Sequence, residues 1–221
     1  MRLLCGVAAV LLLVWPALSQ QQPENKEAPK PDAPKPVEAK KPEPPKEKAF
    51  DEIIKEAKEI KGLFTLYRTE EKVYLELLPA QLDKIYMASL TCDSGLGERG
   101  FYAGAMCGET PFIFHKQGKN VHMFAVNPRF TAAEGSPMAR AVGRSFSDSV
   151  IGMAKIESLP HPERKSVLID LGSILLVDVP MLAYPLEATF RIPYRFDGKN
   201  SFFRDVKGFE KNVEIGVLAH Y

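Results

Sequence analysis

The stretch FIFHKQGKNVHMFAV, residues 112–126, decides the fold class of this chain. Residues 112–116 and 121–126 are two β-prone runs in which apolar and polar side chains alternate. The four residues between them, QGKN at 117–120, include the glycine and the asparagine that tight turns favour. This pattern predicts an antiparallel β-hairpin.

Similar strand patterns occur on both sides of this hairpin. A second hairpin is expected where residues 63–67 and 73–77 are joined by the polar segment 69–72. Short connections without room for a crossover helix favour antiparallel pairing of these strands. The remaining strand candidates are residues 85–91, 167–171, 188–193 and 213–218.

Helical spacing marks two longer segments. Apolar residues recur at three- and four-residue intervals over residues 50–60, shortly before Gly62, and again over residues 138–153. Shorter helical turns are expected at residues 79–84 and 174–177. Together with the strands, these segments predict an α+β, β-rich fold with a mostly antiparallel sheet and two or three helices.

The N-terminus has the pattern of a secretory signal peptide. A positively charged start precedes the apolar residues 3–18, and Ala17 and Ser19 are the small side chains ahead of a predicted cut between Ser19 and Gln20. An uncleaved membrane anchor is the alternative, but this apolar run falls short of the ~20 residues that cross a bilayer core. Cleavage is therefore expected to remove residues 1–19. The mature protein is expected to be exported to the periplasm or the extracellular space.

Residues 20–48 form a segment that is rich in proline, lysine and glutamate and contains no aromatic residue. Such a composition cannot bury a core, so a disordered linker is expected. Its opposite charges nearly cancel, and the whole chain has a formal net charge of +1. We therefore expect no nucleic acid as partner, and a membrane only if the signal segment stays uncleaved.

The residues after the linker contain the aromatic and β-branched side chains that a core requires. They are expected to form an N-terminal α+β region with hairpins at 49–127 and a second α+β region at 128–221. The second region ends directly after an apolar strand pattern that no later segment covers. We therefore expect the chain to be a fragment, truncated in its second region.

Two of the three cysteines remain once Cys5 has left with the signal peptide. These two, Cys92 and Cys107, are expected to form a disulfide in an oxidising compartment. Closing a loop of this length stabilises a fold by roughly 3 kcal/mol. The alternative is a pair of buried free thiols.

No motif in the chain supports catalysis or cofactor binding. Residues 95–100 match G-x-G-x-x-G, but no helical pattern begins after them and no acidic residue follows at the distance that holds a ribose. His115 and His122 flank the hairpin turn and lack the third ligand that zinc requires. The serines within residues 145–149 lie outside any nucleophile motif and fit a structural role on one helix face. No catalytic, cofactor-binding or metal-ligating residue is therefore predicted.

Several short motifs over nearly all of residues 50–221 resemble one protein family. They are GLF at 62–64, VYLE at 73–76, RSFSDSV at 144–150, VLID at 167–170 and FEKNVE at 209–214. With the helical pattern that precedes them, they resemble the N-terminal region of a large family of exported bacterial zinc-dependent metalloproteases.

The resemblance implies uncharacterised, β-rich domains ahead of a separate catalytic domain with an H-E-x-x-H helix. In such a helix two histidines hold zinc and the glutamate polarises the attacking water. This chain contains no such motif, so the resemblance transfers no catalytic residue to it. It implies that the chain is inactive alone, that zinc belongs only to the missing catalytic domain, and that the partners are this peptidase domain of the same polypeptide and protein or peptide substrates.

Two hypotheses about function follow. In the first, the chain is a non-catalytic N-terminal module of a secreted zinc-dependent metalloprotease-like protein and packs against the missing peptidase domain. In the second, it is a complete envelope-associated binding or structural protein with a periplasm-spanning proline-rich spacer. The N-terminal residue separates them, because cleavage leaves Gln20 and an anchor retains Met1.

Overall fold

The computed structural model describes residues 48–221, which all belong to one compact unit. The predicted signal peptide, its cut between Ser19 and Gln20, and the predicted linker up to residue 47 lie outside the described residues. In chain order the elements are α1 (Phe50–Ile54), β1 (Lys58–Ile60), β2 (Thr65–Arg68), β3 (Val73–Leu77), the 3-10 helix Pro79–Gln81, β4 (Tyr86–Cys92), β5 (Ala105–Gln117), β6 (Asn120–Ala125), α2 (Pro137–Ser145), β7 (Ser149–Lys155), β8 (Val167–Asp170), α3 (Gly172–Leu175), α4 (Ala183–Phe190), β9 (Phe202–Gly208) and β10 (Val213–Leu218).

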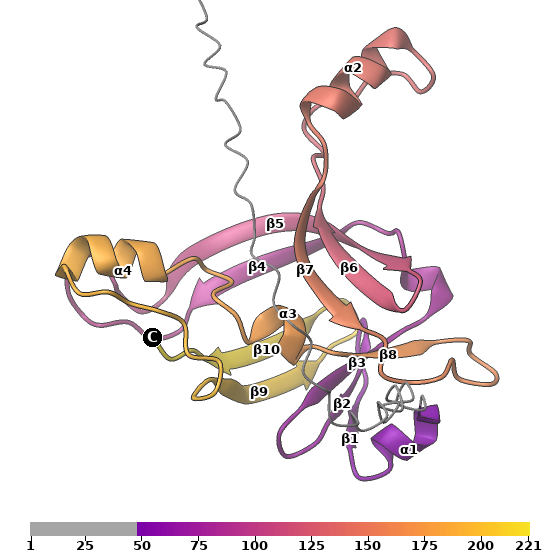
Figure 1. The fold of residues 1–221 in the computed structure, drawn as a ribbon, viewed down its shortest axis with the longest axis horizontal. Coiled ribbons are helices and arrows are strands. Elements are labelled where there is room, and N and C mark those ends of the chain that lie inside the picture. Colours follow the sequence, from indigo (N-terminus) through magenta and orange to yellow (C-terminus); the bar gives the residue numbers. More distant parts are fainter. Residues whose placement is uncertain (1–47) are drawn as a thin grey trace, which may run out of the picture. The chain divides into compact units, whose positions relative to one another are not determined.

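Two four-stranded sheets organise the described residues (Figure 1). The first has the strand order β1-β2-β3-β8, the second has the order β4-β5-β6-β7, and β9 and β10 form a separate two-stranded ribbon. Neighbouring strands in all three are antiparallel. The predicted fold class, α+β and β-rich with mostly antiparallel sheets, is confirmed.

Residues 112–126 form the hairpin that their pattern predicts. β5 and β6 pair from Phe112 opposite Ala125 to Gln117 opposite Asn120. Gly118 in the turn has a φ of 59°, a left-handed conformation that glycine adopts without steric cost. β5 begins earlier than expected, at Ala105, so the hairpin extends into a pairing with β4. The second predicted hairpin is formed by β2 and β3.

The inward faces of the two four-stranded sheets share one hydrophobic core. β3 directs Val73, Leu75 and Leu77 to this core because alternate side chains of a strand point to the same face, and each is at most 2 % exposed. The second sheet contributes Phe112 and Phe114 from β5. Both sheets combine strands from before and after residue 127, the boundary at which the sequence patterns divided the folded part.

The opposite face of the first sheet is covered by α1. Phe50 on this helix is 2 % exposed and packs with Tyr67 of β2 and Leu168 of β8 in a second, smaller core. The rings of Phe50 and Tyr67 meet edge to face with 6.2 Å between centroids. A helix of five residues is marginal alone, so this burial holds it in place.

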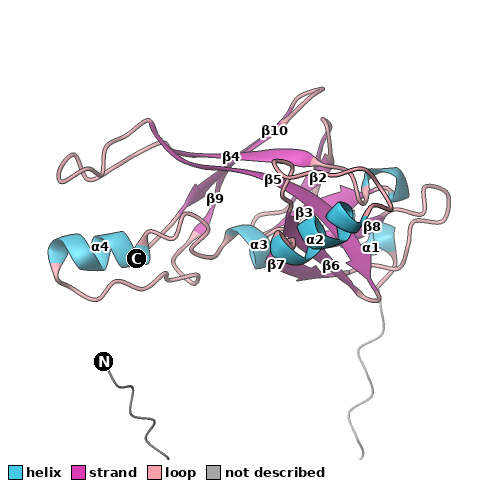
Figure 2. Ribbon diagram, turned by 90° about the horizontal axis from the view of Figure 1, so that it is seen from above, coloured by secondary structure: helices cyan, strands magenta, loops and turns pink. Residues whose placement is uncertain are grey.

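The segment between β6 and β7 forms an arm, residues 126–148, that carries α2 away from both sheets (Figure 1), and in the view from above α2 is drawn in front of them (Figure 2). Ser136 caps α2, because its hydroxyl accepts a hydrogen bond from the amide of Ala139 at 3.0 Å. Phe130 and Phe146 stack at the base of the helix with 4.0 Å between ring centroids. No residue of α2 is buried.

The helix predicted over residues 50–60 is wrong beyond Ile54. Residues Lys58–Ile60 form β1 instead. Ile60 is paired with Leu66 of β2 and packs against the main core. An apolar residue at three- and four-residue spacing can also satisfy a strand this short. The free edge of β2 decides the conformation, because its backbone groups find hydrogen-bond partners in β1.

The helix predicted over residues 138–153 is wrong in its second half. α2 ends at Ser145, and Ser149–Lys155 forms β7, which pairs with β6. The strand predicted at 188–193 is also wrong, because α4 continues to Phe190. In both segments the local pattern fits either conformation, and pairing or packing partners far along the chain select one.

Candidate functional site

The second sheet has a surface that points away from the core, and we call it the outer face. Side chains alternate along a strand, so the positions between the buried Phe112, Phe114 and Val121 point outward. Cross-strand pairing then aligns these outward positions across the sheet. The centre of the outer face consists of Met87, Pro111, Ile113, His115, His122, Phe124, Val150 and Met153, and Ser89, Glu109, Gln117, Asn120 and Lys155 lie toward its ends.

The centre of the outer face is largely apolar and is open. Met87 is 64 % exposed, Val150 56 % and Met153 45 %. Outward side chains of neighbouring strands lie next to one another: Ile113 is opposite Phe124, and Phe124 is opposite Val150. Scattered exposed apolar residues are ordinary, but a contiguous set on one sheet face is typical of an interaction surface.

The arm adds a second exposed surface, that of the amphipathic helix α2. Met138 of α2 is 64 % exposed, and no residue of α2 is buried against the described residues. Arg140 and Arg144 lie one helical turn apart and therefore on the same side of the helix. The arm thus offers apolar and basic side chains together.

The β5–β6 pairing places His115 directly opposite His122 on the outer face. His115 Nδ1 lies 2.6 Å from Asp83 Oδ1. His122 Nδ1 is buried, and no hydrogen-bond partner in residues 48–221 reaches it. Both rings contact Phe124, with centroids 6.1 and 6.0 Å apart. Over the same residues, no three histidine, cysteine or acidic side chains come together in a way that could hold a metal ion.

A buried carboxylate lies on the α1 side of the first sheet. Glu76 of β3 is 4 % exposed, and both of its oxygens accept hydrogen bonds. Tyr67 donates its hydroxyl to Oε2 at 3.0 Å, Arg164 donates Nε–H to Oε1 at 2.7 Å, and Ser166 donates its hydroxyl to Oε1. The arginine and serine come from positions 88 and 90 residues further along the chain.

These contacts shift the pKa values of Glu76 and Tyr67 in opposite directions. Burial alone would raise the pKa of Glu76, but the hydrogen bonds from Ser166, Arg164 and Tyr67 outweigh it, so the pKa lies below its ordinary value. Burial, followed by the hydrogen bond to Glu76, raises the pKa of Tyr67 well above its ordinary value. Near neutral pH the glutamate is therefore charged and the tyrosine is protonated.

This arrangement is suited to holding structure rather than to transferring protons. A carboxylate with a lowered pKa and three donors is a weak general base. It fastens the segment before β8 to β3 beside a hollow of about 230 Å³ that Lys61, Gln81 and Arg164 help to line. The sequence analysis missed Glu76, although an acidic residue within the apolar strand VYLEL was a usable signal.

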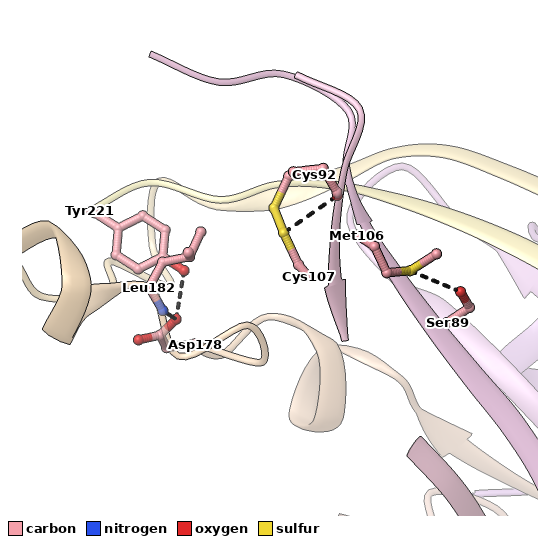
Figure 3. The surroundings of a disulfide bond; sticks show 8 residues. Ser89, Cys92, Met106, Cys107, Asp178, Leu182 and Tyr221 are labelled. Atoms are coloured by element: carbon pink, nitrogen blue, oxygen red, sulfur yellow. Dashed lines mark hydrogen bonds between the residues drawn. A yellow bond between two sulfur atoms is a disulfide. The ribbon is translucent and has the colours of Figure 1, made fainter. Parts of the chain in front are cut away.

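The predicted disulfide residues lie together in the structure. Cys92 at the end of β4 and Cys107 in β5 form a disulfide with 6.1 Å between Cα atoms (Figure 3). Near it, Asp178 accepts hydrogen bonds from the Leu182 amide at 2.8 Å and from the Tyr221 hydroxyl at 2.6 Å. The bond therefore closes the β4–β5 hairpin beside the segment that contains α4.

The glycine-rich segment 95–100 lies in the loop between β4 and β5, and the serines within residues 145–149 lie where α2 ends and β7 begins. Gly97 and Gly100 have φ angles of 77° and 89°, and the next element is a strand rather than the helix of a dinucleotide site. Ser145 ends α2 and Ser149 begins β7, so the expectation that they share a helix face is wrong. No helix among residues 48–221 has the length and apolar character needed to cross a membrane.

The described residues thus form a β-rich α+β protein with two antiparallel sheets around one core and an open apolar sheet face. The chain belongs to the family described as "Domain of unknown function (DUF5117)", whose profile matches residues 104–221. A second profile, "Domain of unknown function (DUF5118)", matches residues 47–88. Neither a curated protein nor a solved structure matches the chain.

Proposed function

We propose that this chain is the non-catalytic N-terminal module of an exported zinc-dependent metalloprotease-like protein. In this proposal the module packs against the peptidase domain of the same polypeptide and supports it, through the outer face and the arm. Zinc belongs to the peptidase domain, and no residue of this chain is assigned to metal or to catalysis.

The outer face is the observation that carries this proposal. Burying exposed apolar surface is worth about 25 cal/mol per Å². Met87, Val150 and Met153 keep between 45 and 64 % of their surface exposed on one sheet face, so a partner that covered them would gain this energy. A catalytic role for the chain has no comparable support, because Glu76, the one buried carboxylate among residues 48–221, is occupied by three donors.

The order of the matched segments also supports the proposal. The resemblance implies uncharacterised β-rich domains ahead of a catalytic domain, and this chain matches two domains of unknown function in succession, at residues 47–88 and 104–221. The strands of both segments contribute to the shared core. They are therefore suited to act as one module.

The reading frame that follows the codon for Tyr221 tests the proposal directly. An H-E-x-x-H motif within a few hundred residues downstream is the expected result. A stop codon immediately after Tyr221 would contradict the proposal and favour the envelope-associated protein with a proline-rich spacer. Independently, purified protein from Gln20 to Tyr221 should not hydrolyse peptides, and zinc-dependent hydrolysis that a chelator abolishes would overturn the non-catalytic role.

A pair of matched variants tests the outer face. Val150 and Ile192 are both 56 % exposed, but only Val150 lies on the outer face. Val150→Asp should weaken binding of the separately produced peptidase domain by about tenfold or more, since it places a charge in an apolar contact. Ile192→Asp should leave binding unchanged, and equal effects of both substitutions would exclude the outer face as the contact.

A further inference from the structure

The disulfide between Cys92 and Cys107 lies where the pairing of β4 with β5 is interrupted. The register shifts between Leu90 and Thr91, so Cys107 is an extra residue of β5 that faces no residue of β4. Such a β-bulge disrupts the ladder of backbone hydrogen bonds. Two residue pairs lie beyond the bulge, and the last of them is Cys92 with Ala105. The disulfide is therefore the strongest connection between the two strands at this end (Figure 3).

We call residues 93–104, which join β4 to β5, the disulfide loop. Four of its twelve residues are glycine, and none of the twelve is buried. A glycine-rich segment without buried side chains has high conformational freedom while its ends are free. The Gly104 amide donates a hydrogen bond to the Cys92 carbonyl at 2.8 Å. Closure by the adjacent disulfide removes much of the remaining freedom.

The disulfide loop contacts the C-terminal end of α4. The Arg99 guanidinium donates a hydrogen bond to the Thr189 carbonyl at 3.3 Å and lies over the ring of Phe190, 5.0 Å from its centroid. The ring of Phe101 lies 6.0 Å from the same phenylalanine ring. Both loop residues flank Gly100, so these contacts depend on the conformation of the loop.

The C-terminal half of α4 has few other partners in the described residues. Leu186 is its buried residue, at 6 % exposed, and it belongs to neither hydrophobic core. The Glu187 carboxylate binds Arg195 at 3.0 Å, and the Phe190 ring contacts Tyr194. Both partners belong to the segment that directly follows the helix, so they do not connect it to a sheet. The disulfide loop is therefore the main connection between this half of α4 and the second sheet.

The N-terminal end of α4 is held by a different group. Asp178 accepts hydrogen bonds from the amides of Leu182 and Ala183 at 2.8 and 3.0 Å. The same carboxylate accepts a hydrogen bond from the Tyr221 hydroxyl at 2.6 Å (Figure 3). None of these contacts involves the disulfide loop. The two ends of the helix can therefore be released separately.

We propose that the Cys92–Cys107 disulfide is a redox-sensitive clasp for α4. While the bond is intact, it keeps the disulfide loop ordered, and the loop holds the C-terminal half of α4. When the bond is reduced, the loop loses its closure and this half of the helix is released. The inference is independent of the proposed function, because it involves neither the outer face nor the arm.

A dithiol is the reductant that this step requires. One of its thiolates attacks one cysteine sulfur, which breaks the S–S bond, forms a mixed disulfide and releases the other cysteine. The second thiol then displaces the first cysteine and closes the disulfide of the reductant. The dithiol thereby supplies two electrons and two protons, and Cys92 and Cys107 both become thiols.

Amide hydrogen exchange measured by NMR tests the clasp, with dithiothreitol as the dithiol. Reduction should speed exchange of the Arg191 amide, which donates to the Glu187 carbonyl at 2.9 Å, by about tenfold or more, because local opening of this end becomes easier. The amides of Leu182 and Ala183 should stay within about twofold of their rates in the oxidised chain, since Asp178 still holds them. Alkylation afterwards confirms that both cysteines are free.

Arg99→Ala separates the loop contact from the disulfide. In the oxidised chain it should speed exchange of the Arg191 amide by about fivefold, because a hydrogen bond and a cation–π contact are lost. Reduction of this variant should then add less than it does in the wild type. Arg140→Ala is the matched control, since Arg140 is also exposed and donates to one backbone carbonyl, that of Gly135, on the arm. It should leave exchange in α4 unchanged.

The proposal fails if reduction leaves the Arg191 amide unchanged. It also fails if the amides of Leu182, Ala183 and β3 accelerate as much as that of Arg191, because the whole fold rather than one end of α4 would then have loosened. A reduced chain that circular dichroism shows to be unfolded counts as this second result. An effect of reduction that is undiminished in Arg99→Ala would show that the disulfide does not act through the loop contact.

Discussion

Removal of the Glu76 carboxylate should destabilise the fold strongly, and the expected size follows from its contacts. In Glu76→Leu the hydroxyls of Tyr67, which is 4 % exposed, and Ser166, which is fully buried, lose their acceptor. Each unsatisfied buried donor costs about 1–3 kcal/mol. Arg164 is half exposed and can turn to water. We therefore expect a loss of about 2–5 kcal/mol in the free energy of unfolding.

Glu76→Gln removes the charge but keeps one of the two acceptor oxygens. The amide oxygen can still accept hydrogen bonds from Arg164 and Ser166, whereas the amide nitrogen in place of Oε2 cannot accept one from the Tyr67 hydroxyl, so the charge and one of the two acceptor atoms are lost. We expect a cost of about 1–2 kcal/mol, clearly below that of Glu76→Leu. Glu59→Gln is the matched control, because Glu59 lines the same hollow but its side chain is 46 % exposed. Its cost should stay within about 0.5 kcal/mol.

Urea unfolding at neutral pH measures all three variants. The midpoint should fall without a change in slope, because the surface exposed on unfolding is the same. For a folded part of this size, each kcal/mol corresponds to about 2–4 °C in Tm. A Glu76→Leu variant within about 0.5 kcal/mol of the wild type would refute the reasoning, as surface substitutions commonly fall in that range. Equal losses for the Leu and Gln variants would show that what both variants lose, the charge and the acceptor of the Tyr67 hydroxyl, dominates over the hydrogen bonds from Arg164 and Ser166.

The pH dependence of stability gives the same interaction a second measurement. The pKa of Glu76 is lower in the folded protein than its ordinary value of 4.5. Its stabilisation is therefore complete above the unfolded pKa and is lost as pH falls through the folded pKa, because the unfolded chain takes up the proton first. The difference in unfolding free energy between wild type and Glu76→Gln should shrink over this acidic range. A constant difference would contradict the assigned shift.

The remaining predictions concern the disulfide, the arm and the N-terminus. Reduction should lower the free energy of unfolding by about 3 kcal/mol, and alkylation without reduction should add no mass at Cys92 or Cys107; a labelled cysteine would exclude the bond. Ser136→Ala should speed amide hydrogen exchange in α2 about fivefold, equivalent to ~1 kcal/mol for a lost helix cap, while leaving Tm unchanged because α2 buries no residue; a lower Tm would mean that the arm packs on the core. N-terminal sequencing of the protein purified from its native host should begin at Gln20 if the proposed signal peptide is cleaved, and a retained Met1 would indicate an anchor.

The local sequence pattern was sufficient to predict the secondary structure of a segment whose backbone hydrogen bonds could be formed in only one way. The hairpin of residues 112–126 was predictable because turn residues and β-prone runs coincide, and β5 and β6 need only each other to form it. Residues 58–60 and 149–155 were not predictable, because their apolar spacing fits a helix as well as a strand. They became strands when β2 and β6 offered them hydrogen-bond partners.

The candidate sites likewise divide into those that the sequence predicted and those that only the tertiary structure revealed. Cys92 and Cys107 could be paired from the sequence, since removal of the predicted signal peptide would take Cys5 with it and leave one possible pairing. The outer face could not be recognised, because alternation shows that a strand has two faces without showing which one a second sheet will cover. Glu76 was visible as an acidic residue in an apolar strand, but its partners lie 88 and 90 residues away.

By itself the sequence determined the secondary structure that adjacent residues can complete, the β-rich fold class and the cysteine pair. Tertiary structure alone decided which face of the second sheet stays open, which donors surround Glu76 and which helix the disulfide loop contacts. The physical reason is range: turns and strand propensities act over a few residues, whereas burial and hydrogen-bond satisfaction depend on groups that only folding brings together.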